Sequence, residues 1–140
     1  MTHTNPLGKP AHRVLCIDDN CDVLQLEKAI LEEAGYEVLL ASNGADGLNL
    51  ARGSMVDILI LDCEMPQMTG TEVAHRIRAM RPMLPIIMVS GADQPKETTG
   101  ILDCFVPKTQ MPKTLLPEVK RLLHRWPIAV AYERIRRKFD

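Results

Sequence analysis

The fold is decided by residues 58–70, which read ILILDCEMPQMTG. The first four residues are apolar without a break, which is typical of a strand buried on both faces of a parallel sheet. The run ends in Asp62, and a loop that contains Pro66 and Gly70 follows. We therefore expect Asp62 at the carboxyl end of a strand, at the edge where open α/β sheets place their functional sites.

Short apolar runs alternate with amphipathic segments on both sides of this stretch. The pattern predicts strands at 14–17, 36–41, 56–61, 85–89 and 104–106, and helices at 21–34, 45–52, 71–80 and from Thr114 onward. Asn20 is predicted to cap the first helix, and Pro117 is expected in the first turn of the last one, where proline is tolerated. Strands bounded by helices in this way predict an α/β domain whose parallel sheet is covered on both faces.

Length and composition suit one ordered domain. The chain has 140 residues and a formal charge of −1, with 46% hydrophobic and 25% charged residues. Such values exclude disorder as the main state. The longest apolar runs are far below the ~20 residues that cross a bilayer, and the first residues lack an apolar signal-peptide core. A cytoplasmic protein with no membrane association is therefore expected.

The two ends of the chain differ from its middle. Residues 1–12 are predicted to form a flexible N-terminal tail, and the folded domain is expected over 13–126. Residues 127–140 are predicted to form a C-terminal amphipathic helical extension, with Ile128, Tyr132, Ile135 and Phe139 on one face. This extension either packs back on the domain or offers a partner surface. Residues 108–140 hold 9 Lys/Arg and 3 Asp/Glu, but no groove-reading motif accompanies the charge, so no nucleic acid is expected.

Cysteine and histidine residues do not predict a metal or redox site. The four cysteines form no CxxC pair, and reduced core thiols are the favoured interpretation, with a redox sensor as the alternative; they are Cys16, Cys21, Cys63 and Cys104. His75 and His124 have no partner carboxylate in helical register, so both are predicted to be surface residues.

Residues whose side chains can bind metal or phosphate lie at the carboxyl ends of four of the five predicted strands. The first strand ends in Asp18 and Asp19, the third in Asp62 and the fourth in Ser90, while Lys108 follows the fifth. Converging carboxylates repel one another unless a cation lies among them. A small number of hard oxygen ligands suits Mg²⁺.

This set is also suited to phosphoryl transfer. A carboxylate beside Mg²⁺ can attack phosphorus and form an aspartyl-phosphate. The reaction needs positioning and charge stabilisation, to which Lys108 contributes a second positive charge and Ser90 a hydroxyl donor. The constellation is therefore complete for accepting and holding a phosphoryl group.

At these residues the chain resembles the receiver domain of two-component response regulators, over about residues 13–126. The matching pieces are VLCIDD at 14–19, ILILDCEMPQMTG at 58–70, IIMVSG at 86–91 and FVPK at 105–108. The second piece is the most specific. The resemblance implies a flavodoxin-like three-layer α/β/α fold with a five-stranded parallel sheet in the order 2-1-3-4-5.

The resemblance also implies residue roles. Asp62 would be the phosphoacceptor, and Mg²⁺ would be held by Asp18, Asp19, Asp62 and the backbone carbonyl of Glu64. Lys108 and Ser90 would bind the phosphoryl group, Ser90 and Phe105 would form the switch, and Glu64 and Ala92 would tune the phosphoryl lifetime. The donor would be a sensor histidine kinase or a histidine phosphotransfer protein, and the output a contact with an unknown downstream protein.

Two departures from the family pattern predict local differences. Thr109 follows Lys108 where the family usually has a proline after a cis peptide, and a cis bond before threonine would cost about 3 kcal/mol. The usual loop geometry is therefore not expected. Ser90 and Lys108 are 18 positions apart, about one helical turn fewer than is common, and Pro95 and Gly100 lie between them. The fourth helix should be short, irregular or mobile.

Two alternatives to a phosphorylated receiver stay open. One is a pseudo-receiver, an interaction module that works without phosphorylation, which Thr109 and the shortened segment favour slightly. The other is a phosphatase with an aspartyl nucleophile, because Asp62-Cys63-Glu64 resembles a DxD motif. Such enzymes place that motif on an early strand and need room for a cap, so a non-enzymatic protein is expected.

Overall fold

The computed structural model describes residues 11–125 of the chain. The predicted N-terminal tail, apart from its last two residues, lies outside the described residues. So does the predicted C-terminal extension, and both stay predictions.

Between residues 11 and 125, five strands alternate with four α-helices and two 3₁₀ turns. The strands are β1 (Arg13–Ile17), β2 (Glu37–Ala41), β3 (Ile58–Asp62), β4 (Ile86–Ser90) and β5 (Cys104–Pro107). The α-helices are α1 (Cys21–Glu33), α2 (Gly44–Gly53), α3 (Gly70–Met80) and α4 (Met111–Arg125). The 3₁₀ turns are η1 (Lys96–Thr98) and η2 (Lys108–Gln110).

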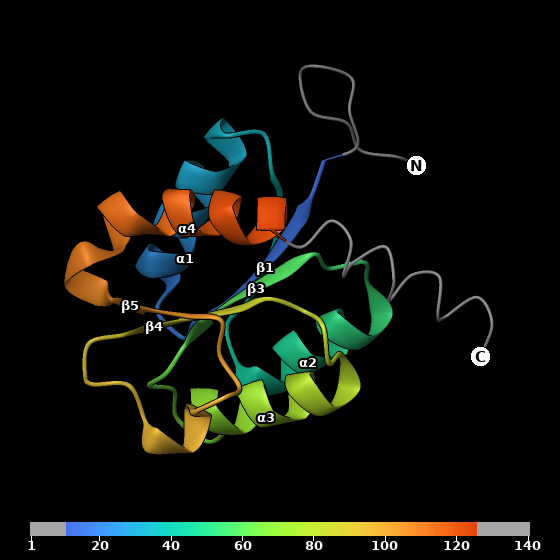
Figure 1. Cartoon of the computed structure of the whole chain (residues 1–140), viewed down its shortest axis with the longest axis vertical. Coiled ribbons are helices and arrows are strands. Elements are labelled where there is room, and N and C mark those ends of the chain that lie inside the picture. The colour runs from blue at the N-terminus through green and yellow to red at the C-terminus, as the bar shows by residue number, and fades with distance from the viewer. Residues whose placement is uncertain (1–10, 126–140) are drawn as a thin grey trace.

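The five strands form one parallel sheet in the order β2-β1-β3-β4-β5, as predicted. The helices α1 and α4 cover one face, and α2 and α3 cover the other (Figure 1). The register pairs Ile17 with Leu61, Asp62 with Val89, and Ser90 with Pro107. The residues that follow these positions therefore emerge together at one edge of the sheet.

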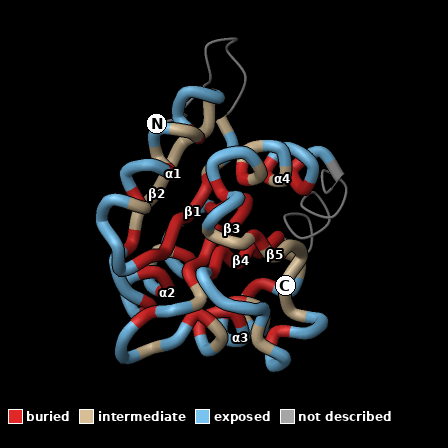
Figure 2. The backbone as a smooth tube through the Cα atoms, turned by 90° about the vertical axis from the view of Figure 1, so that its left-hand side faces the viewer, coloured by how far each residue is buried: buried red, intermediate tan, exposed pale blue. Residues whose placement is uncertain are grey.

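Alternate strand residues supply two separate cores. Leu15, Leu59 and Met88 face α2 and α3, whereas Cys16, Ile60 and Ile87 face α1 and α4. Every residue of β3 and β4 is buried, which explains why their sequences are apolar up to the final residues Asp62 and Ser90. Figure 2 shows this burial concentrated along the strands and on the inner sides of the helices.

Side-chain caps start the helices that follow β1, β2 and β3. Asn20 accepts from the backbone N–H of Asp22 at 2.9 Å, which confirms the predicted cap of α1. Asn43 begins α2 and Thr69 begins α3 in the same way. Each cap satisfies a backbone donor that the first helical turn leaves without a partner. The caps therefore fix the point at which each loop of the site edge joins its helix.

Two details of the helices differ from the predictions. The last helix begins at Met111, because η2 runs directly into it and the buried Met111 anchors its first turn. Pro117 consequently lies inside α4, so its predicted place in the first turn is wrong. In α1, the charged residue Glu27 is buried between Leu24 and Leu31 on the inner face, which the apolar pattern did not indicate.

The connection between β4 and β5 contains η1 and no α-helix, which confirms the prediction of a short, irregular segment. Side chains of α3 hold it in place. Arg78 donates to the carbonyls of Ile101 at 2.7 Å and Leu84 at 2.7 Å, and it forms an ion pair with Asp103 at 3.0 Å. The ring of His75, exposed as predicted, lies 2.8 Å from the carbonyl of Glu97. The contacts with Ile101 and Glu97 reach carbonyls of the connection that an α-helix would otherwise satisfy internally.

We expect Arg78→Ala to lower the free energy of unfolding by about 2 kcal/mol, because it leaves the partly buried carbonyls of Leu84 and Ile101 without a side-chain donor and removes one of the two donors of Asp103. Urea denaturation of the full chain measures the change. Arg76→Ala, an exposed arginine on the same helix, is the control and should stay within about 0.5 kcal/mol of wild type. Equal small losses in both variants would contradict the role given to Arg78.

Candidate functional site

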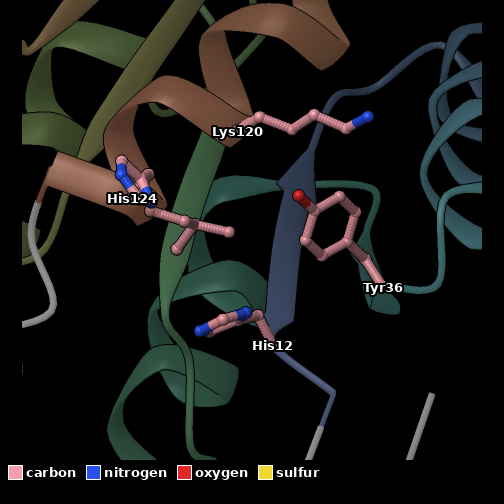
Figure 3. Close-up of a pocket in the computed structure, with 5 residues that line it drawn as sticks. His12, Tyr36, Lys120 and His124 are labelled. Carbon is pink, nitrogen blue, oxygen red and sulfur yellow. The ribbon is translucent and has the colours of Figure 1, made fainter. Parts of the chain in front are cut away.

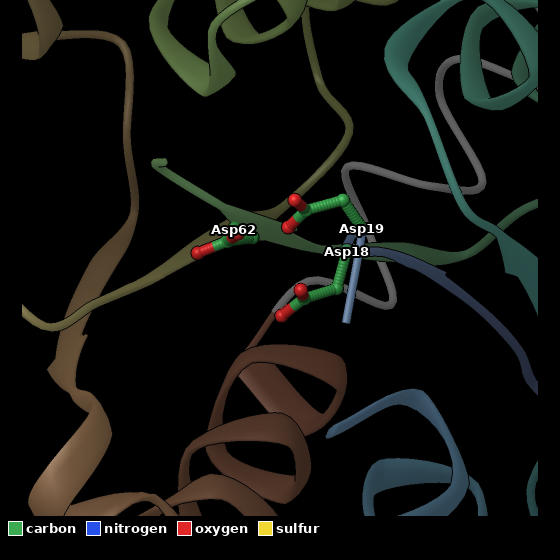
Figure 4. A group of neighbouring side chains, drawn as sticks. All are labelled: Asp18, Asp19 and Asp62. Carbon is green, nitrogen blue, oxygen red and sulfur yellow. The ribbon is translucent and has the colours of Figure 1, made fainter. Parts of the chain in front are cut away.

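Three carboxylates gather at the carboxyl edge of the sheet. Asp18 and Asp19 follow β1 and Asp62 ends β3, and one oxygen from each lies within 4.8 Å of the others (Figure 4). Asp18 and Asp62 are each 2% exposed, whereas Asp19 is exposed. The structure therefore brings together the three acids that the sequence predicted as metal ligands.

Backbone contacts fix the acids in place. The N–H of Asp18 donates to the carbonyl of Ala41 at 3.1 Å, and the Asp18 carboxylate accepts from the N–H of Asn20 at 2.8 Å. Beyond β3, the N–H of Cys63 donates to the carbonyl of Val89 at 3.0 Å. Parallel pairing thus continues one residue past Asp62.

Gly70 lets α3 begin close to the end of β3. Its N–H donates to the carbonyl of Cys63 at 3.0 Å, and a Cβ at this position would lie 2.2 Å from the carbonyl oxygen of Asp62. No side chain fits at that distance. The Pro/Gly loop after Asp62 therefore needs glycine at its end to turn back over the strand.

Lys108 completes the cluster. Its Nζ lies 3.1 Å from Oδ1 of Asp62, as expected for a residue that follows β5. Within residues 11–125 no peptide bond is cis, so the Lys108–Thr109 bond is trans, and the expected departure from the usual loop geometry is present. Burial lowers the pKa of Lys108, but the neighbouring carboxylates of Asp62 and Asp18 more than offset this and leave it raised. Lys108 is thus a permanent cation at neutral pH.

The buried acids Asp18 and Asp62 both carry raised pKa values, and desolvation by burial is the largest cause for each. Burial, aided by the charge of Asp62, raises the pKa of Asp18 to about 6, although the N–H of Asn20 opposes the shift. Burial also raises the pKa of Asp62, against the opposing effect of Lys108. Repulsion of this kind is relieved when a cation lies among the carboxylates.

The donor set fits a small hard cation. Apart from the ion pair with Lys108, both oxygens of Asp62 are buried without a well-formed hydrogen bond from the described residues. Buried carboxylate oxygens in that condition are costly unless a cation or water satisfies them. Asp18, Asp19 and Asp62 could therefore hold Mg²⁺, which prefers few protein ligands and retains waters. The Glu64 carbonyl, two residues after Asp62, stays a predicted further ligand.

The remaining predicted site residues lie around this cluster. Ser90 ends β4 and is 1% exposed, and its hydroxyl donates to Oε1 of Glu64 at 2.9 Å. The N–H of Ala92 donates to the same hydroxyl at 3.0 Å. Phe105 lies on β5 in register with Met88 and is half-buried against the α2–α3 core. Sequence reasoning did not anticipate the Ser90–Glu64 hydrogen bond.

Sequence reasoning also missed Glu27. It is 1% exposed, and its Oε1 has no hydrogen-bond partner among residues 11–125. Burial, together with the nearby charges of Asp18 and Asp62, raises the pKa of Glu27 to about 8. Its spacing of three from Leu24 and four from Leu31 was the available signal, because those intervals share a helix face.

The cysteines are free thiols. Cys16 is buried, Cys63 and Cys104 are half-buried and Cys21 is exposed, so the expectation of core burial is wrong for Cys21. Burial is the largest cause that raises the pKa of the Cys63 thiol beside Asp62. A raised pKa keeps a thiol protonated and unreactive at neutral pH.

A separate hollow of about 570 Å³ lies at the other edge of the sheet, before β1 and β2. It is lined by His12, Tyr36, Lys120, Leu123 and His124, with His124 exposed as predicted (Figure 3). The rings of His12 and Tyr36 are 6.5 Å apart. None of the predicted site residues lines this hollow.

Comparison with known proteins identifies the family of the chain. The family model of the response regulator receiver domain matches residues 14–119. The chain belongs to the response regulator receiver domain family. Receiver domains are signalling modules of two-component systems, and they bind Mg²⁺ at an acidic site. Of the described helices, none combines the length and apolar character that crossing a membrane requires.

Individual relatives cover the described domain. The alkaline phosphatase synthesis transcriptional regulatory protein PhoP of Bacillus subtilis is 31% identical over 121 residues, 84% of this chain and 50% of that protein. The chain spans about half the length of the curated regulators of this kind that it matches.

Solved receiver domains show the same fold. One CheY-like receiver from Methanospirillum hungatei is 29% identical, with a TM-score of 0.78 over 82% of this chain and 95% of that one. TrrA from Thermotoga maritima, solved in complex with Mg²⁺-BeF, is 33% identical, with a TM-score of 0.75 over 79% of this chain and 98% of that one.

We expect stability to fall as pH rises from about 4.5 toward 8, because folding raises the pKa of Glu27 to about 8 from its ordinary 4.5. The folded state holds the proton more tightly, so this stabilisation is complete below pH 4.5 and is lost as pH rises through 8. Glu27→Leu should therefore raise the free energy of unfolding at pH 9 by a few kcal/mol, on the order given by the pKa shift, and by much less at pH 5.

Urea denaturation between pH 4 and 9 measures this dependence. Glu33→Gln replaces an exposed acid on the same helix and is the control. Its free energy of unfolding should change with pH as steeply as that of wild type. Asp18 also has a raised pKa, so a shallower slope should remain near pH 4–6 in Glu27→Leu. An unchanged slope above pH 6 would show that Glu27 does not hold its proton in the folded state.

Proposed function

We propose that the chain accepts a phosphoryl group on Asp62 in an Mg²⁺-dependent reaction and signals through protein contacts in its phosphorylated form. The observation that carries this proposal is the cluster of Asp18, Asp19 and Asp62 within 4.8 Å, with the ammonium of Lys108 at 3.1 Å from Asp62. The complete set argues against a pseudo-receiver that has lost its chemistry.

Each residue has a role in the proposed transfer. An oxygen of Asp62 forms the new bond to phosphorus while the bond to the donor's histidine nitrogen breaks and its electron pair returns to the imidazole. Lys108 stabilises the charge on the phosphoryl oxygens, and Ser90 supplies a hydroxyl donor. Mg²⁺, held by Asp18, Asp19, Asp62 and the carbonyl of Glu64, supplies further positive charge.

Family membership supports the finer assignments of this proposal. The donor is a sensor histidine kinase or a histidine phosphotransfer protein. Ser90 and Phe105 form the switch, and Glu64 and Ala92 tune the phosphoryl lifetime. The output is a contact with a downstream protein, reached without nucleic acid or membrane binding by the domain itself.

We expect acetyl phosphate with Mg²⁺ to phosphorylate the full chain at Asp62, because the small donor needs only the carboxylate, the cation and Lys108. A phosphate-affinity gel should show a retarded band that Asp62→Ala abolishes. Asp93→Asn, an exposed acid beyond β4, is the matched control and should keep the band. Removal of Mg²⁺ with a chelator should remove it.

Two results would change the conclusion. A chain that folds like wild type but gives no band dependent on Asp62 would favour the pseudo-receiver, to which the short β4–β5 connection is the relevant structural difference. Repeated turnover of many phosphate esters would favour the phosphatase instead.

A further inference from the structure

The hydroxyl of Ser90 is already occupied. A serine hydroxyl has one proton to donate, and Ser90 donates it to Oε1 of Glu64 at 2.9 Å. The oxygen also accepts the N–H of Ala92 at 3.0 Å. Ser90 therefore cannot donate to a phosphoryl oxygen on Asp62 until the bond to Glu64 breaks.

We propose that Glu64 is a latch that competes with the phosphoryl group for the proton of Ser90 and so favours the unphosphorylated arrangement. This inference rests on the proposed function, because the competitor is a phosphoryl group on Asp62. Glu64 acts through Ser90 and is a positioning residue.

The fold places the three groups for such an exchange. Asp62 pairs in register with Val89, the residue before Ser90, and Ser90 pairs with Pro107, the residue before Lys108. Ser90 therefore lies on the strand between Asp62 and Lys108. Glu64 follows Asp62 by two residues and reaches back over the end of β4, where a Cβ at Gly91 would lie 3.8 Å from its Oε1.

Charge makes the two partners of Ser90 mutually exclusive. Glu64 lies near enough to Lys108 to contribute to the raised pKa of that ammonium. A phosphoryl group on Asp62 would bring a second anion to the same neighbourhood, and like charges repel. Glu64 is exposed, so its carboxylate can leave Ser90 and be hydrated at small cost. The exchange breaks the charge-assisted hydrogen bond from Ser90 to Glu64 and forms one from Ser90 to the phosphoryl group. Its net free energy is therefore close to zero.

The latch predicts that removing the Glu64 carboxylate strengthens binding of a phosphoryl mimic. We expect Glu64→Ala to tighten binding of beryllofluoride in the presence of Mg²⁺ by about tenfold, which corresponds to about 1.4 kcal/mol. Isothermal titration calorimetry on the full chain measures the affinity. Glu97→Ala, an exposed acid on η1, is the control and should leave it unchanged.

A double-mutant cycle separates the latch from simple repulsion. In a Ser90→Ala background no proton is contested and only the charge repulsion of Glu64 remains, so Glu64→Ala should raise the affinity by clearly less than tenfold. An equal tenfold gain in both backgrounds would mean that Glu64 acts by its charge alone, and the latch would be overturned.

The same four proteins test the hydrogen bond without any phosphoryl mimic. Urea denaturation should give a non-zero coupling between Glu64→Ala and Ser90→Ala, because each substitution removes the same bond. Zero coupling together with normal beryllofluoride binding would overturn the latch and leave the proposed function standing. If the folded wild-type protein shows the coupling but binds no beryllofluoride with Mg²⁺, the proposed function fails, and the competition fails with it.

Discussion

Repulsion among Asp18, Asp19 and Asp62 is the constraint on which the site depends. Parallel strands bring their carboxyl ends to one edge, and the register leaves these carboxylates within 4.8 Å of one another in a partly desolvated setting. Unrelieved, such an arrangement destabilises the folded state. Lys108 relieves part of it, and a bound dication would relieve more. The repulsion among these carboxylates in the folded state thus favours binding of a cation at the site.

Much of the fold and of the acid cluster could be predicted from the sequence. The spacing of apolar residues indicated the strands and helices, and the place of a polar residue at the end of a strand indicated the site. Continuous apolar runs identified β3 and β4, and a residue at the end of a parallel strand has only one edge to occupy. The placement of Asp62 near Lys108 follows from this rule even though 46 positions separate them. Caps were equally local, since Asn20 needs only the next helical turn.

Features that depend on particular side-chain contacts could not be predicted. Glu27 occupies a core position in α1 at helical spacing from Leu24 and Leu31. A leucine there would have been predicted as a core residue, whereas a charged residue is normally assigned to the surface. The start of α4 was predicted at Thr114, three residues late, because η2 runs directly into the helix at Met111. The bond between Ser90 and Glu64 depends on the direction of two rotamers, which no periodicity encodes.

The hydrogen bonds of Arg78 affect how the domain unfolds. Its guanidinium binds carbonyls on both sides of β4, at Leu84 before the strand and Ile101 after it, while Asp103 accepts from both Arg78 and the N–H of Ile86. Detaching the β4–β5 connection therefore breaks the bonds that begin β4. The connection and the strand form one cooperative unit, in which partial melting of the connection alone is disfavoured. A segment without α-helical structure is in this way bonded to both α3 and the start of β4.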